Sequence, residues 1–200
     1  MTQQEKISYI IGRDMAANLT KQGISIEAEA FLKGMKEALA GQPSSLSANE
    51  VQQAMMALQQ EMGQKQGAQA AENKKEGEEF LASNKNKEGV NTLPSGLQYQ
   101  VLNEGTGKTP SSTDRVTTHY HGTLIDGTVF DSSYERGQPA TFPVNGVIAG
   151  WTEALQLMKE GAKWRLFIPS NLAYGSQGAG DAIGPNATLI FDVELISVNK

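Results

Sequence analysis

Residues 116–130 read VTTHYHGTLIDGTVF, and this stretch decides the fold of the C-terminal half. Its first part, residues 116–125, is rich in Thr, aromatic and β-branched side chains, which favour an extended strand. The Asp126-Gly127 pair is a strong signal for a tight hairpin turn, and residues 128–130 then begin a second strand. The stretch therefore predicts an antiparallel hairpin at the centre of a sheet.

The remainder of residues 95–200 continues this pattern. Alternation with a period of two, typical of strands with one buried face, recurs in three segments: residues 97–101, 163–168 and 189–195. The only helical spacing lies at residues 151–158, between two glycines. We therefore expect an α+β arrangement in which an antiparallel sheet is wrapped on one short helix.

The first half of the chain has a different composition. Residues 1–94 contain six of the seven Met but only three of the thirteen aromatic residues, and the other ten aromatics lie in residues 95–200. Such a division is typical of a helical module followed by a module of strands and turns. The predicted domains are a helical dimerisation domain at 1–62, a long connecting helix at 63–94 and a sheet domain at 95–200.

Three helices are predicted in the first half. Thr2 with Glu5 and Ser47 with Glu50 have the spacing of capping boxes, and Ser25 is the expected cap of the helix between them. Apolar side chains follow each start at helical spacing. They are Ile7, Ile10, Ile11, Met15 and Leu19 in the first helix, Ala28, Phe31, Leu32, Met35 and Leu39 in the second, and Val51, Met55, Leu58 and Met62 in the third.

The third helix extends into a polar segment. From residue 63 to residue 79 the only apolar side chains are alanines, and Ala, Gln, Glu and Lys dominate. This composition favours one continuous helix, although Gly63, Gly67 and Gly77 each weaken it by about 1 kcal/mol relative to Ala. A flexible linker over residues 63–88 is the alternative.

The helical module has a thin core. Modules below ~70 to 80 residues usually need a metal, a disulfide or a partner chain, and residues 1–94 contain neither Cys nor His. A second copy of the chain is the remaining source of stability. We therefore expect a homodimer through residues 1–62, with packing against the chain's own C-terminal domain as the alternative.

Several classes of function lack their usual residues. Lys and Arg number 17 against 22 Asp and Glu, giving a net charge of -5, so no nucleic-acid partner is expected. The chain has no Cys, and His119 and His121 are its only histidines. Two histidines without a third ligand or an activated nucleophile make neither a metal site nor a hydrolytic triad. No metal and no cofactor are therefore expected.

The cellular location of the protein is predicted from its N-terminal residues and from the length of its apolar segments. No segment has the ~20 apolar residues of a membrane span, and residues 1–11 do not have the basic start and long apolar region of a signal peptide. The prediction is a cytoplasmic protein without a membrane span. The alternative is a periplasmic or outer-membrane-associated protein whose signal peptide has been removed.

An ordered set of short motifs identifies the second half. These are Tyr120, the run Gly127 to Ser133, Arg136-Gly137, the run Val147 to Trp151, the run Leu172 to Gly175 and the run Ala187 to Leu195. Residues 95–200 thus resemble the FKBP-type peptidyl-prolyl cis-trans isomerases. The helical half is similar to the dimerising arm of the macrophage infectivity potentiator (Mip) group of bacterial FKBPs.

The resemblance implies an activity and partners. The protein would accelerate rotation about X-Pro bonds in folding polypeptides and act as a chaperone in the form of a V-shaped homodimer. Its partners would be unfolded or folding polypeptides that contain proline, and FK506/rapamycin-type macrolides could occupy the same site. A non-catalytic module that binds Pro-containing segments is the alternative.

The resemblance also implies the site residues. The catalytic group would be Asp131, Tyr120, Tyr174 and Phe130, and Tyr120 and Arg136 would orient Asp131 toward the rotating amide. The proline ring would sit on Trp151, while the N–H of Ile148 and the hydroxyl of Tyr174 hold substrate carbonyls. The other residues expected to contact substrate are Phe142, Val147, Ile183 and Phe191. Asp181 places a charge in the neighbouring loop, residues 178–184.

Overall fold

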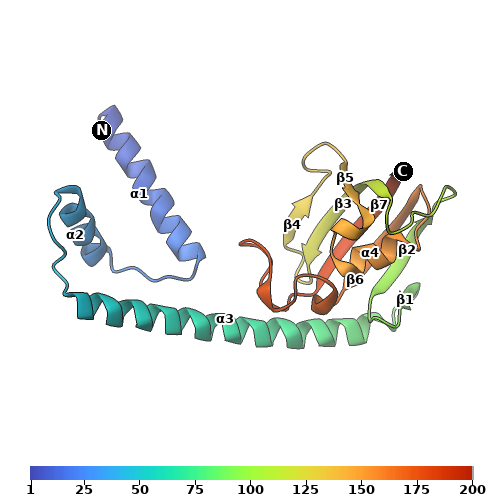
Figure 1. The fold of residues 1–200 in the computed structure, drawn as a ribbon, viewed down its shortest axis with the longest axis horizontal. Coiled ribbons are helices and arrows are strands. Elements are labelled where there is room, and N and C mark those ends of the chain that lie inside the picture. Colours follow the sequence, from blue (N-terminus) through green and yellow to red (C-terminus); the bar gives the residue numbers. More distant parts are fainter. Residues whose placement is uncertain (200) are drawn as a thin grey trace. The chain divides into compact units, whose positions relative to one another are not determined.

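The computed structural model describes residues 1–199 of the chain (Figure 1). The chain divides into two compact units, residues 1–67 and residues 68–200. The boundaries expected from composition, after residues 62 and 94, stay predictions. Each unit is described by itself below.

The first unit is helical. It contains α1 (Gln3–Lys21), α2 (Ala28–Leu39) and the first part of α3 (Ala48–Asn84). The capping box at Thr2 is confirmed, because its hydroxyl accepts from the Glu5 N–H at 3.2 Å and the Thr2 N–H donates to the Glu5 carboxylate at 2.6 Å. Ser47 likewise accepts from the Glu50 N–H at 3.3 Å and donates its own N–H to the Glu50 carboxylate at 2.8 Å.

The prediction that Ser25 caps α2 is wrong. The helix begins at Ala28, and the residue before it, Glu27, makes no side-chain hydrogen bond to the helix start. Ile24 and Ile26 are half-buried while Ser25 between them is exposed, the alternation of an extended segment. Packing of these two isoleucines therefore delays the start of the helix.

The second unit contains the end of α3 and a seven-stranded antiparallel sheet. The strands are β1 (Val90–Thr92), β2 (Gln98–Glu104), β3 (Arg115–Leu124), β4 (Val129–Ser132), β5 (Ala140–Pro143), β6 (Ala162–Ile168) and β7 (Leu189–Asn199). Their order is β1-β2-β6-β7-β3-β4, and β5 also pairs with β3. The long central strands β3, β7 and β6 thus bring segments far apart in the sequence side by side.

The hairpin predicted at Asp126-Gly127 joins β3 to β4. Gly127 has φ +88°, a backbone conformation that favours glycine. The Asp126 carboxylate accepts from the Thr128 N–H at 2.8 Å, which fixes the turn. The register pairs His121 with Ser132 and Gly122 with Asp131, so Asp131 lies opposite a residue near the C-terminal end of β3.

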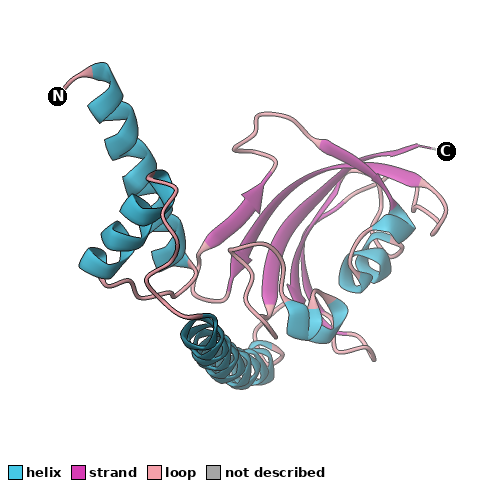
Figure 2. Cartoon of the chain, turned by 60° about the vertical axis from the view of Figure 1, so that its left-hand side comes forward, coloured by secondary structure: helices cyan, strands magenta, loops and turns pink. Residues whose placement is uncertain are grey.

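One short helix, α4 (Ala149–Leu155), packs on one face of the curved sheet (Figure 2). Its Trp151, Ala154 and Leu155 are buried together with side chains from the sheet, among them Leu166 and Val193. Helices followed by an antiparallel sheet on a short helix are the predicted architecture. The fold class is therefore confirmed.

The opposite face of the sheet is contacted by the end of α3. Because Leu166 and Ile168 point toward α4, Phe167 between them points to the other side. The rings of Phe80 and Phe167 have their centroids 5.9 Å apart, and Asn84 donates its amide to the Gln98 side chain at 3.0 Å. The last turns of α3 are therefore part of the second unit.

Neither a membrane-spanning helix nor a cluster of metal ligands occurs among the described residues. Within residues 1–199 no helix combines the length and the apolar character that a bilayer span needs. Over the same residues no three His, Asp or Glu side chains gather as the ligands of a metal ion would.

Candidate active site

An aromatic cavity of about 710 Å³ opens between α4, the sheet and two loops. Ten of the eleven site residues expected from the sequence line it. They are Tyr120 on β3, Phe130 and Asp131 on β4, Phe142 on β5, Val147 and Ile148 before α4, Trp151 in α4, Tyr174 and Ile183 in the loops that precede β7, and Phe191 on β7. Arg136, the eleventh, lies beside the cavity and contacts two of them.

The floor of the cavity is the indole of Trp151, of which 4% is exposed. Three aromatic rings meet it edge-on or tilted: Tyr120 at 5.3 Å, Phe142 at 5.4 Å and Phe191 at 5.2 Å between centroids. Such arrangements place the positive edge of one ring against the negative face of another and stabilise the cluster beyond its burial. The floor is therefore a rigid apolar surface.

Three polar side chains form a hydrogen-bonded cluster at one side of the cavity. The Tyr120 hydroxyl donates to Asp131 Oδ2 at 2.6 Å and accepts from Arg136 Nη2 at 2.7 Å. Arg136 Nη1 also pairs with Asp131 Oδ1, and its guanidinium lies 5.4 Å from the centre of the Tyr120 ring. These three side chains form a closed triangle, so the orientation of each one is fixed by the other two.

The pKa values of two members of the triangle, Tyr120 and Arg136, are raised. Burial raises the pKa of Tyr120, and the hydrogen bond to Asp131 adds to the increase. Hydrogen bonds to Tyr120 and Asp131 raise the pKa of Arg136. At neutral pH the phenol therefore stays a hydrogen-bond donor and the guanidinium stays charged.

Two further polar groups belong to residues of the cavity lining and have no protein partner among the described residues. Over residues 1–199 no protein acceptor takes the backbone N–H of Ile148 or the hydroxyl of Tyr174, although both residues line the cavity. Tyr174 is 40% exposed. Both groups are therefore accessible to the carbonyl oxygens of a bound molecule.

The cavity also has a wall that the sequence analysis did not assign. Ala179, Gly180 and Ala182 line it together with Asp181 and Ile183. Of these five residues, only Ile183 was predicted from the sequence to contact substrate, and Asp181 was predicted only to place a charge in this loop. Small side chains carry no signal of their own, and only the backbone path of the loop brings them to the cavity.

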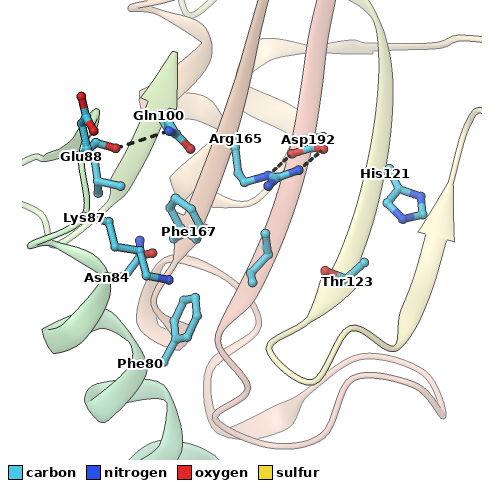
Figure 3. A pocket seen from close by; sticks show the side chains of 12 residues that line it. Phe80, Asn84, Lys87, Glu88, Gln100, His121, Thr123, Arg165, Phe167 and Asp192 are labelled. Atoms are coloured by element: carbon cyan, nitrogen blue, oxygen red, sulfur yellow. Dashed lines mark hydrogen bonds and ion pairs between the residues drawn. The ribbon is translucent and has the colours of Figure 1, made fainter. Parts of the chain in front are cut away.

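A second cavity, of about 570 Å³, lies on the opposite face of the sheet (Figure 3). Phe80 and Phe167 form its apolar part, while Arg165 donates to both carboxylate oxygens of Asp192 at 2.6 and 2.7 Å. Figure 3 shows this ion pair and His121 along the same side of the cavity. None of the eleven expected site residues lines it, so it is separate from the aromatic cavity.

Two family models match the chain. Residues 106–196 match the FKBP-type peptidyl-prolyl cis-trans isomerase, and residues 4–101 match the domain amino terminal to FKBP-type peptidyl-prolyl isomerase. The chain is 47% identical to the outer membrane protein MIP of Legionella longbeachae, over all of its own length and 87% of that relative. The chain belongs to the FKBP-type peptidyl-prolyl cis-trans isomerases.

Other members of the FKBP family give the same result. The chain is 46% identical to the FKBP-type 22 kDa peptidyl-prolyl cis-trans isomerase of Escherichia coli, over 98% of this chain and 96% of that one. The crystal structure of FkpA from Escherichia coli is 39% identical and aligns with a TM-score of 0.73, covering 99% of this chain and 97% of that one. The similarity therefore includes both the helical part and the FKBP part, and the protein is a peptidyl-prolyl isomerase.

Proposed function

We propose that the aromatic cavity is the isomerase site and that Trp151 is the surface on which the substrate proline lies. The observation that carries the proposal is the arrangement of Tyr120, Phe142 and Phe191 around the buried indole, with centroids 5.2 to 5.4 Å from it. A proline ring is compact and apolar, and the floor offers it an aromatic surface of matching character.

Such a site fits the chemistry of X-Pro rotation. The barrier of ~18 to 20 kcal/mol arises because resonance keeps the amide planar, and no covalent bond other than this partial double bond has to be weakened. A twisted amide has lost resonance and carries less charge on its oxygen than the planar amide. An apolar cavity therefore favours the twisted form over the ground state, which is catalysis by differential binding.

The polar triangle orients Asp131 toward the substrate amide. Asp131, fixed by Tyr120 and Arg136, faces the side of the cavity where the rotating amide would lie. The Ile148 N–H and the Tyr174 hydroxyl would each hold a carbonyl of the substrate on either side of the proline. Only the bond between them would then be free to turn.

The first test is the cis-trans exchange rate of a short Ala-Leu-Pro-Phe peptide, measured by NMR line shape with catalytic amounts of the full chain. We expect exchange far faster than the tens to hundreds of seconds of the uncatalysed bond. A macrolide of the FK506 type, which we propose fits the same cavity, should abolish the acceleration. Acceleration that the macrolide leaves unchanged would place the activity elsewhere.

We also propose that residues 1–62 form a homodimer. No residue of α1 or α2 is buried within one chain, and Ile10, Leu32 and Met55 are each more than half exposed, at 57%, 51% and 60%. Large apolar side chains exposed in this number mark an interaction site, and a second copy carries the same side chains. Sedimentation equilibrium that gives a single 21.5 kDa species at micromolar concentration would contradict the dimer.

A chaperone role is proposed for the same protein. A dimer would present two aromatic cavities to one unfolded polypeptide, and the two attachments would raise the apparent affinity without any new contact. Suppression of the aggregation of a proline-containing client by the full chain tests this role. If a variant whose cavity no longer binds substrate suppresses aggregation as well as the wild type does, the suppression belongs to the helical unit.

An exported location is proposed in place of the cytoplasmic one. The comparisons do not support the cytoplasmic prediction, and the Legionella longbeachae relative is named an outer membrane protein. Fractionation of cells that express the natural gene, followed by immunoblotting, tests the location. Recovery of the whole protein with cytoplasmic markers would contradict it.

A further inference from the structure

The loop of residues 178–184 forms one wall of the aromatic cavity. Ala179 and Ile183 bond to each other in both directions, with N···O distances of 2.8 and 3.1 Å. These two bonds close the loop upon itself, and five of its residues line the cavity, including Ile183, which is 8% exposed. The position of Ile183 over the cavity therefore depends on what holds the base of the loop.

The base of the loop contacts α3 through two asparagines. Asn73 Nδ2 donates to the Pro185 carbonyl at 2.8 Å, and Asn186 Nδ2 donates to the Ala70 carbonyl at 3.2 Å. Asn186 has φ +57°, a conformation that non-glycine residues seldom adopt. The backbone of the loop thus has an unusual conformation at the residue that bonds to α3.

The helix and the chain just after the loop approach unusually closely. Gly77 is buried, and a Cβ added there would overlap Thr188 Oγ1 and lie 3.2 Å from Thr188 Cβ. A Cβ added at Gly184 would lie 3.0 Å from the Asn73 amide nitrogen. A side chain at Gly77 would require Thr188 to shift, and one at Gly184 would require the Asn73 amide to give by a few tenths of an ångström. The contact is therefore built by specific residues of both segments, all within the second unit.

We propose that Asn73 and Gly77 of α3 are positioning residues of the isomerase site. They hold the base of the loop at residues 184–188, and the loop then places Ile183 and its neighbours against the substrate. This inference rests on the proposed role of the aromatic cavity. It gives the C-terminal part of α3 a part in substrate binding, although neither Asn73 nor Gly77 lines the cavity.

The physical effect follows from the freedom of the loop. Without the asparagine contact, the loop would populate conformations in which Ile183 does not cover the cavity. Substrate affinity falls in proportion to the fraction of molecules in the competent conformation. The chemistry of rotation at Trp151 and Asp131 is unchanged once substrate is bound. Weakening the contact should therefore raise KM and leave kcat close to that of the wild type.

The test uses Asn73→Asp in the full chain. The substitution keeps the volume but replaces the donor with a carboxylate oxygen that faces the Pro185 carbonyl. We expect KM for an X-Pro peptide to rise about three- to tenfold, the effect of losing about one hydrogen bond, while kcat stays within about twofold. The matched control, Lys74→Ala, changes the next, exposed residue of the same helix and should match the wild type. An Asn73→Asp variant with unchanged KM would overturn the proposal.

A second pair of variants keeps the test independent of Asn73. Gly77→Ala should raise KM because its methyl group displaces Thr188. Thr188→Ala removes the overlapping hydroxyl, so the double variant Gly77→Ala/Thr188→Ala should recover most of the wild-type KM. Recovery supports positioning through this contact. A double variant no better than Gly77→Ala alone would count against it.

Failure of this inference can be told from failure of the proposed site. The wild type and Phe142→Ala are measured in the same assay. If Phe142→Ala turns over like the wild type, the cavity is not the site and the inference fails with it. If Phe142→Ala is impaired while Asn73→Asp and Gly77→Ala match the wild type, the site stands and only the role of α3 is wrong.

Discussion

Apolar side chains are exposed in the helices at the start of the chain and buried in the sheet unit that follows. In α1 and α2 no residue is buried, and Leu39 is 85% exposed. In the second unit Leu155, Leu166 and Leu195 have no exposed surface. Burial of apolar surface is the main source of folding free energy. One unit thus completes its core alone, while the other has a surface that a second chain would have to cover.

The largest expected effect is on assembly. Ile10→Asp places a charge on the exposed apolar side of α1, and burying an unpaired carboxylate is strongly unfavourable. We expect the dissociation constant of the dimer to rise by at least about a hundredfold, about 3 kcal/mol. Ala16→Asp adds the same charge to an exposed position on the far side of the helix and should leave the dimer intact. Sedimentation equilibrium of the three proteins decides between these outcomes.

A pair of leucine substitutions tests whether the two units differ in stability. Leu166→Ala removes a fully buried side chain and should lower the free energy of unfolding of the second unit by about 2–5 kcal/mol. Leu39→Ala removes a side chain that is exposed in the single chain, and at protein concentrations below the dissociation constant of the dimer it should change stability by less than about 0.5 kcal/mol. Urea unfolding followed by circular dichroism measures both. A similar loss from both variants would show that the contrast between the units is only apparent.

Turnover should depend on the second unit alone. Phe142→Ala removes a ring that contacts the Trp151 floor, and we expect kcat/KM for a short peptide to fall about tenfold, about 1.4 kcal/mol. Asp131→Leu should lower it similarly because the polar triangle loses its carboxylate. Thr141→Ala, next to Phe142 but exposed, is the matched control. Full activity in both site variants would disprove the assigned roles.

The smallest effect is on the pH dependence of the sheet unit. Burial, with a hydrogen bond to Glu194 at 2.9 Å, raises the pKa of Tyr134 to about 12. The folded state thus favours the neutral phenol, so this stabilisation is complete below pH ~10 and is lost as pH rises toward 12. Because Tyr134 is 42% exposed, solvent screening limits the effect to less than about 1 kcal/mol.

The check is the urea midpoint measured across this alkaline range. Tyr134→Phe should make the midpoint less dependent on pH between 10 and 12. An identical pH dependence in wild type and variant would show that other groups control it.

Local signals in the sequence predicted local structure well. The capping boxes at Thr2 and Ser47 and the hairpin at Gly127 each depend on residues within three positions of one another. The motif order of the resemblance then named ten residues that the fold brings into one cavity. These residues come from separate strands and loops, and neither composition nor periodicity could have brought them together.

Gly77 shows why contacts between distant segments could not be predicted from the sequence. From the sequence it only weakens a helix, because glycine has a low helix propensity. The structure shows that Thr188, which is far from Gly77 in the sequence, packs so closely against the helix that a Cβ at position 77 would overlap it. The roles of Asn73 and Asn186 could not be predicted either, because the sequence around each of them is ordinary and polar. Ser25 failed for a related reason, since packing of Ile24 and Ile26 outweighed a local capping preference.

The placement of the tryptophans has a practical consequence. Trp151 and Trp164 are the only two in the chain, and both lie in the second unit. Trp151 is the cavity floor, whereas Trp164 is stacked on Tyr99 at 4.3 Å and does not line the cavity. Indole fluorescence therefore reports on the sheet unit alone, and the helical unit contributes no indole signal. A Trp164→Phe variant would leave Trp151, beneath the bound ligand, as the single tryptophan. Binding to the cavity could then be measured by intrinsic tryptophan fluorescence, without an attached dye.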